Sequence, residues 1–224
     1  GVFNHVSRNH PAVQTALDET AGRLNPADNP WHGLVRAHVG DNGEPALDVF
    51  EGHGDLVALD HSADETVDYV AHVMSHWLDR GAAGWRLDAA YAVPSPFWAR
   101  VLPQVKAAHP YSWIFGEVIH GDYPRIIEES TMDSITQYEL WKSIQHALET
   151  ENFFELDWNL KRHNAFLDSF VPQTFIGNHD VTRIASQIGP AKAALALAVL
   201  MTVGGVLRRR TGLCGRQAGA FRRR

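Results

Sequence analysis

Charged and polar side chains stand at three points of the sequence where apolar segments end. Arg86 and Asp88 lie within GWRLDAAYA, Glu117 ends the apolar part of YSWIFGEV, and residues 178–180 close PQTFIGNHD. Residues two apart in a strand point to the same face, so Arg86 and Asp88 are expected to share one side. A charge in apolar surroundings is costly unless it is paired or used, so these residues are candidates for a site.

Three acids around one pocket suit the cleavage of a glycosidic bond. One carboxylic acid must protonate the leaving oxygen, and one carboxylate must attack or stabilise the oxocarbenium-like carbon. Arg86 would keep Asp88 ionised as the nucleophile. Glu117 lies in an apolar strand, where burial favours the protonated form that proton donation requires. His5 and His179 could hydrogen-bond to sugar hydroxyls.

Each pattern taken alone also has a structural interpretation. Arg86 with Asp88 is as readily a structural ion pair as a catalytic one. The segment 178–180 fits a turn or a helix N-cap, because Asn and Asp side chains accept hydrogen bonds from nearby backbone N–H groups. His5 and His10 could suggest a metal, but no third ligand follows at a recognisable spacing, so no metal site is expected.

The elements that must position these side chains alternate between strand and helix. The periodicity predicts strands at 84–90, 111–118, 132–139 and 172–180, and helices at 62–81, 95–110, 122–130, 138–150, 157–169 and 190–201. The strands are apolar runs, as is typical of a parallel sheet covered on both faces. In such folds, polar residues at the carboxyl ends of strands mark the site.

Local signals refine these boundaries. Ser62 and Glu65 are expected to form a capping box at the start of the helix 62–81, and Ser95 is expected to cap the next helix. Pro190 is expected to begin the last helix. Residues 1–60 are rich in Gly, Pro, Asn and Asp and are expected to be irregular, forming a long functional loop or a subdomain.

Composition narrows the class of protein. The chain has 224 residues, 45% of them hydrophobic, and a formal net charge of −6, which suits one large globular domain. Residues 208–224 hold seven Arg and no acid, so the remainder is more acidic still and offers no basic surface for nucleic acid. Cys214 is the only cysteine, which excludes an intrachain disulfide and is compatible with the cytoplasm. The most apolar run, 193–205, is shorter than a membrane span, so no membrane partner is expected.

Four segments, taken in order, resemble the conserved regions of the alpha-amylase family, glycoside hydrolase family 13. GVFNHVS resembles the first region, GWRLDAA the second, FGEV the third and FIGNHD the fourth, while DLVALDH loosely resembles an additional motif of the loop domain. The resemblance implies a retaining mechanism on α-glucosidic bonds, with an α-glucan or a small α-glucoside as substrate. A transglycosylase or glucosyl isomerase of the same family remains an alternative. A non-catalytic carbohydrate-binding or partner-binding protein on the same fold is the alternative from another class.

The resemblance also assigns roles to single residues. Asp88 matches the nucleophile, Glu117 the general acid/base and Asp180 the third acid, which stabilises the transition state. The residues that line the sugar subsite at the cleavage point are matched by His5, Arg86 and His179. Asn4 and Asn178 match positions that support the site structurally. In some members the position of Asn4 binds calcium, but its usual partners are not identifiable in the sequence, so no cofactor is expected.

The resemblance implies an α/β fold, a partial (β/α)8 TIM barrel that lacks the first two strands and the eighth. Residues 1–5 are expected to end the third barrel strand and residues 6–60 to form a loop subdomain. Residues 61–205 are expected to form βα units four to seven, and residues 206–224 an aberrant Arg-rich tail. A barrel closes only when all its strands are present. We therefore expect this chain by itself to be inactive or nearly so.

Overall fold

The computed structural model describes residues 1–207 of the chain and divides it into two compact units. The first unit comprises residues 1–117 and 128–132, and the second comprises residues 118–127 and 133 onward. Most of the expected Arg-rich tail, residues 208–224, lies outside the described residues.

The N-terminal part of the first unit is more regular than its composition suggested. Strand β1 (His5–Ser7) pairs antiparallel with β4 (Leu56–Ala58), and β2 (Ala37–Val39) pairs antiparallel with β3 (Pro45–Leu47). Helix α1 (Pro11–Thr20) and the 3₁₀ turns η1 (Pro26–Asp28) and η2 (Phe50–Gly52) complete this part. Helix α1 begins where the His10 side chain accepts a hydrogen bond from the Ala12 N–H and a proline takes the first helical position. His10 and Pro11 are residue types that also occur in loops, so the prediction of an irregular segment was wrong here.

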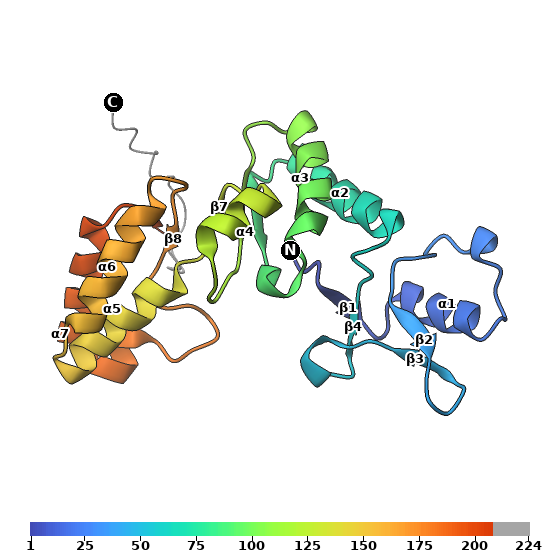
Figure 1. Ribbon diagram of the computed structural model, residues 1–224, viewed down its shortest axis with the longest axis horizontal. Helices are drawn as coiled ribbons and strands as arrows, with labels where there is room; N and C mark the ends of the chain where they lie inside the picture. Colours follow the sequence, from blue (N-terminus) through green and yellow to red (C-terminus); the bar gives the residue numbers. More distant parts are fainter. Residues whose placement is uncertain (208–224) are drawn as a thin grey trace. The chain divides into compact units, whose positions relative to one another are not determined.

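The rest of the first unit follows the predicted alternation (Figure 1). Helices α2 (Asp64–Asp79) and α3 (Ser95–Ala108) pack together, and β5 (Gly84–Leu87) pairs in parallel with β6 (Trp113–Gly116). A short 3₁₀ turn, η3 (Ala90–Ala92), follows β5. The expected helix caps were wrong, because the Ser62 hydroxyl donates to Asp60 Oδ1 and neither α2 nor α3 has a side-chain cap.

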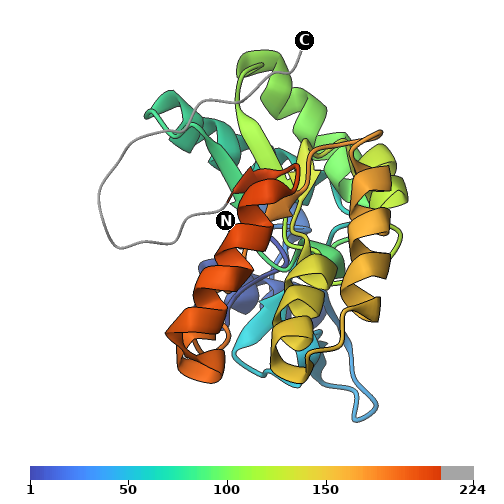
Figure 2. The same ribbon diagram turned by 90° about the vertical axis from the view of Figure 1, so that its left-hand side faces the viewer.

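The second unit consists mainly of helices around a short parallel strand pair. Its elements are β7 (Ser134–Ile135), α5 (Tyr138–Thr150), α6 (Phe154–Phe166), β8 (Gln173–Thr174), α7 (Ile184–Thr202) and β9 (Val206–Leu207), preceded by α4 (Tyr123–Ser130) at the boundary. Helix α5 packs against α6 and α7, which lie side by side with it (Figures 1 and 2). Strand β8 pairs in parallel with β9. The core contains Leu140, Ile144, Leu156, Ala196 and Leu200.

Helix α7 consists of two helical segments. A short segment begins at Ile184, and Gly189, with a φ of 83° and a ψ of 159°, separates it from the longer apolar segment, which begins at Pro190 as predicted. The full segment, Ile184–Thr202, is long and apolar enough to cross a membrane by length and composition, with a hydropathy of 1.5 and 11% of it buried. The expectation that no segment reaches that length is therefore corrected. A single such helix is weak evidence, since it also arises in proteins that never enter a membrane, and the Lys192 ammonium donates to the Leu148 carbonyl of α5 at 2.5 Å.

Candidate active site

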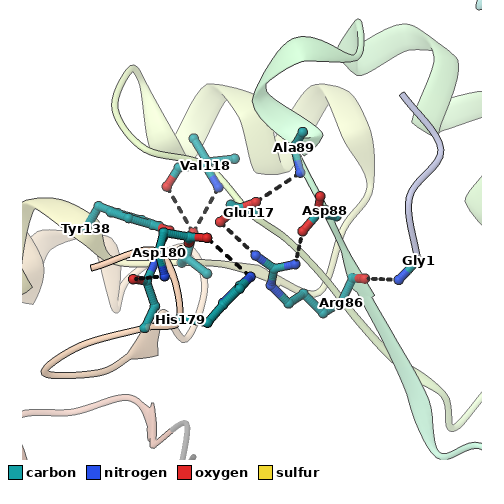
Figure 3. A network of polar contacts seen from close by, with 11 residues as sticks. Gly1, Arg86, Asp88, Ala89, Glu117, Val118, Tyr138, His179 and Asp180 are labelled. Carbon is teal, nitrogen blue, oxygen red and sulfur yellow. Dashed lines mark hydrogen bonds and ion pairs between the residues drawn. The ribbon is translucent and has the colours of Figure 1, made fainter. Parts of the chain in front are cut away.

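The guanidinium of Arg86 holds two carboxylates at one edge of the first unit (Figure 3). Strands β5 and β6 run in parallel and end together, so Asp88 and Glu117 follow neighbouring strands at the same edge. The Arg86 Nη1 donates to Asp88 Oδ1, as the two-residue spacing predicted, and Nη2 lies 2.7 Å from Glu117 Oε1. The two ion pairs of Arg86 differ in sequence separation: Asp88 is its near neighbour in the sequence, whereas Glu117 lies 31 positions away.

The environment of Glu117 is more polar than the sequence suggested. Its side chain is 10% exposed, but Oε1 faces Arg86 and Oε2 accepts a hydrogen bond from the Ala89 N–H at 3.0 Å. Ala89 has a φ of 46°, a left-handed conformation that costs a non-glycine residue about 1–2 kcal/mol. The expectation of an apolar setting missed both donors, because they come from the neighbouring strand and not from the residues that surround Glu117 in the sequence.

The N-terminal residues lie beside β5 and bring His5 towards the acids. The Asp88 N–H donates to the Gly1 carbonyl at 2.8 Å, and Val2 forms a parallel bridge with Asp88. The His5 ring stacks on Phe50, with 5.1 Å between ring centroids and 20° between planes. Burial lowers the pKa of His5, and the charge of Asp88 acts in the opposite direction. A largely neutral imidazole can both donate and accept a hydrogen bond, as a sugar hydroxyl requires.

The surroundings of Asn4 do not fit a calcium site. Asn4 is buried and lines a cavity of about 270 Å³ together with Arg36 and Glu51. Calcium takes six to eight oxygen ligands, whereas this wall carries one carboxylate and a guanidinium whose positive charge opposes a cation. Within residues 1–207, no group of three or more His, Cys, Asp and Glu side chains is arranged to hold a metal ion.

In the second unit, Asn178 orients Asp180. The buried Asn178 side chain donates from Nδ2 to Asp180 Oδ2 and to the Tyr138 hydroxyl, each at 2.7 Å, and its Oδ1 accepts from the Asp180 N–H. His179 Nε2 lies 3.3 Å from Asp180 Oδ1, and the Asp180 side chain is 53% exposed. Because α7 begins only at Ile184, the segment 178–180 forms a turn and does not cap the helix.

Sequence reasoning missed two residues of the second unit, Thr136 and Tyr138, that fix backbone and side chains here. The Thr136 hydroxyl accepts from the Val118 N–H at 2.8 Å and donates to the Val118 carbonyl at 2.9 Å. It thus clamps the peptide that follows Glu117, while Tyr138 accepts from Asn178. Polar residues in the segment SITQY, at the end of the third predicted strand, are the signal that could have identified both.

Known proteins match both the sequence and the structure. The sequence model of the alpha-amylase family, described as alpha amylase, catalytic domain, matches residues 49–208. A cyclomaltodextrinase from Bacillus sp is 27% identical over 206 residues, covering 89% of this chain and 36% of its own length. A maltogenic alpha-amylase from Bacillus acidopullulyticus is 26% identical, covering 84% of this chain and 32% of its own length.

A solved structure shows the fold. A cyclic alpha-maltosyl-(1→6)-maltose hydrolase from Arthrobacter globiformis, in complex with cyclic alpha-maltosyl-(1→6)-maltose, superposes with a TM-score of 0.75 at 20% identity, covering 92% of this chain and 47% of the hydrolase. This chain therefore carries part of the TIM-barrel fold of such enzymes, and it spans about a third of the length of the two curated relatives, 36% and 32%. Since the family model matches more than half of the sequence, the chain belongs to the alpha-amylase family of glycosidases.

Proposed function

We propose that this chain is part of the catalytic domain of a retaining glycoside hydrolase that acts on α-glucosidic bonds of an α-glucan or a small α-glucoside. The observation that carries the proposal is the Arg86 guanidinium, which contacts both Asp88 and Glu117 where two parallel strands end. Membership in the alpha-amylase family supports the substrate class, since the relatives named above are a cyclomaltodextrinase and a maltogenic alpha-amylase.

In the proposed reaction, Asp88 is the nucleophile and Glu117 the general acid/base. The Asp88 carboxylate attacks the anomeric carbon, the bond to the leaving oxygen breaks, and that oxygen takes the proton of Glu117. Water then attacks the same carbon, gives its proton to Glu117 and releases the Asp88 carboxylate. Arg86 pairs with the Asp88 carboxylate and directs it for the attack.

The other assigned residues bind and orient the sugar. His5 and His179 would hydrogen-bond to its hydroxyls, and Asp180 would stabilise the positive charge that develops on the ring in the transition state. Asn178 supports this role by holding Asp180 through two hydrogen bonds. Asn4 supports His5, its chain neighbour, from a buried position.

We further propose that residues 61–205 supply βα units four to seven of the barrel, that residues 1–5 end its third strand and that residues 6–60 form the loop subdomain. The first two strands and the eighth would then come from outside this chain. Catalytic geometry depends on a rigid scaffold, so we expect little or no turnover from these 224 residues alone.

The test is a reducing-sugar assay on maltose, starch and cyclomaltodextrin, with Asp88→Asn and Glu117→Gln as matched variants. The purified chain should stay below about 1 s⁻¹, the low end of ordinary enzymes. Any residual activity should fall by about 10²-fold or more in either variant, because each removes a group that changes charge in the reaction. A Glu117→Gln variant with the full rate would remove Glu117 as the acid.

Two alternatives differ in what the same assay shows. A transglycosylase or glucosyl isomerase of the family would pass the glucosyl group to a sugar hydroxyl, so new oligosaccharides would form without a matching rise in reducing ends. A non-catalytic carbohydrate-binding or partner-binding protein would bind maltodextrin without consuming it. The presence of Asp88, Glu117 and Asp180 together disfavours the second alternative, because binding alone requires no such set of acids.

A further inference from the structure

A loop of the first unit, residues 49–55, is fastened at both of its ends. Val49 bridges to Val57 of β4 at the start of the loop. Near the other end, the Arg8 guanidinium donates to the Gly54 carbonyl at 2.7 Å. These contacts hold the base of the loop but leave its tip, Phe50 and Glu51, to be positioned by other interactions.

A side-chain hydrogen bond connects the tip to the catalytic edge. The Tyr91 hydroxyl donates to Glu51 Oε1 at 3.1 Å, across 40 positions of sequence. Tyr91 is itself tied to the acid/base residue, because its N–H donates to the Glu117 carbonyl at 3.0 Å. Glu51 has a φ of 49°, a left-handed conformation that persists only where surrounding contacts impose it.

The tip of the loop lies beside a cavity. The cavity of about 270 Å³ that Asn4 lines is also lined by Phe50 and Glu51, together with Leu59 and Pro94. A cavity supplies no packing on that side, so the conformation of the tip depends on the contacts it makes elsewhere. The Tyr91 hydrogen bond is one of these contacts, and it reaches the tip from outside the loop.

The tip in turn covers His5, whose ring stacks on Phe50. We propose that the Glu51–Tyr91 hydrogen bond is a latch that keeps Phe50 against His5, which makes Glu51 and Tyr91 positioning residues for the imidazole. The consequence for sugar binding rests on the proposed function, whereas the latch itself does not. Tyr91 suits the donor role, since burial first, and then the hydrogen bond and charge of Glu51, raise the pKa of Tyr91 to about 12.

The latch can be tested on the chain without substrate. Tyr91→Phe and Glu51→Ala remove one partner each, while Glu51→Gln keeps an oxygen that accepts the hydrogen bond. Tyr111→Phe is the matched control, because Tyr111 is 98% exposed. Chymotrypsin cleavage between Phe50 and Glu51, followed by mass spectrometry, reports how often the tip opens.

The first two variants should be cut at this bond about threefold to tenfold faster than the wild type, the equilibrium equivalent of one net hydrogen bond. Glu51→Gln and the Tyr111 control should stay near the wild-type rate. NMR titration, with the His5 signal assigned from a His5→Gln variant, gives a second readout. Loss of the Phe50 cover should raise the pKa of His5 towards its ordinary value. Unchanged cleavage and an unchanged His5 titration in both disrupting variants would overturn the latch.

Maltose binding separates the latch from the proposed function. If the chain binds maltose, Glu51→Ala should weaken the affinity several-fold and Glu51→Gln should restore it. Loss of the latch with no effect on a measurable maltose affinity would overturn the positioning role. A working latch in a chain that binds no maltose would instead support the latch and show that the sugar site is incomplete in these 224 residues.

Discussion

Replacing Arg86 with Ala should destabilise the first unit by about 2–3 kcal/mol. The guanidinium has ionic contacts with Asp88 and with Glu117, and the three side chains are 18%, 31% and 10% exposed, respectively. Removing one member of a fully buried ion pair costs about 3–5 kcal/mol, and an exposed pair contributes about 0–1 kcal/mol. The partial exposure places this network between the two limits, and the variant removes the cation that contacts both carboxylates.

Urea unfolding followed by tryptophan fluorescence measures this loss. Arg23→Ala is the matched control, because Arg23 pairs with Asp18 at 2.7 Å but its side chain is 61% exposed, so it should cost no more than about 1 kcal/mol. Arg86→Lys should fall between the two, since an ammonium keeps the charge but cannot serve two carboxylates with a planar fork.

A further variant would distinguish charge from packing. Adding Glu117→Gln to the Arg86→Ala variant removes one of the two neighbouring carboxylate charges and should recover part of the loss. An Arg86→Ala chain that loses no more stability than Arg23→Ala would refute the reasoning, because the ion pairs of Arg86 would then contribute no more than an exposed pair.

Three other predictions concern pH, metal and backbone. Burial lowers the pKa of His163, and a backbone hydrogen bond acts in the opposite direction. The neutral imidazole should therefore contribute fully to the free energy of unfolding above its ordinary pKa of about 6.5, and this free energy should fall by up to about 1.4 kcal/mol per pH unit below it. His163→Gln should flatten that fall in urea titrations. Millimolar calcium or EDTA should leave the melting temperature unchanged, because the residues around Asn4 do not fit the ion; a clear rise with calcium would contradict this. Gly84→Ala should destabilise the chain by more than about 2 kcal/mol, since its Cβ would lie 1.9 Å from the Trp113 carbonyl oxygen. Gly54→Ala is the control, because its Cβ meets open space, and it should leave the free energy of unfolding in the same denaturation assay nearly unchanged.

Local patterns predicted the parallel part of the fold well because they are set by local physics. Strands β5 and β6 are short apolar runs, and α2 and α5 have apolar residues at helical spacing, so each segment has only one arrangement that buries its apolar side. The secondary structure of residues 6–60 was predicted poorly. Its strand pairs are three residues long, and its helix begins at His10 with Pro11, which are equally frequent in loops.

In the candidate site too, contacts within one segment could be predicted from the sequence, whereas contacts between segments could not. The spacing of Arg86 and Asp88 determines that they share a face, because side chains alternate along a strand. The contact of Arg86 with Glu117 depends on the register between β5 and β6, which pairs Arg86 with Phe115, and no feature of either segment alone specifies that register. For the same reason Tyr91 and Glu51, 40 positions apart, could not be paired from the sequence.

The contacts of Glu117 bear directly on its proposed role. Each of its carboxyl oxygens faces one donor, Oε1 the Arg86 guanidinium and Oε2 the Ala89 N–H. A carboxyl oxygen has two lone pairs, so each oxygen keeps a site that these two contacts do not use. An acid that protonates a leaving oxygen must carry its proton at such a site and aim it at the substrate. The Ala89 N–H is a neutral donor on a left-handed residue, whereas Arg86 is a cation, so Oε2 has the weaker of the two contacts. A proton carried on Oε2 would leave the contacts of Arg86 with Oε1 and with Asp88 in place, which separates the roles of the two acids although one cation holds both.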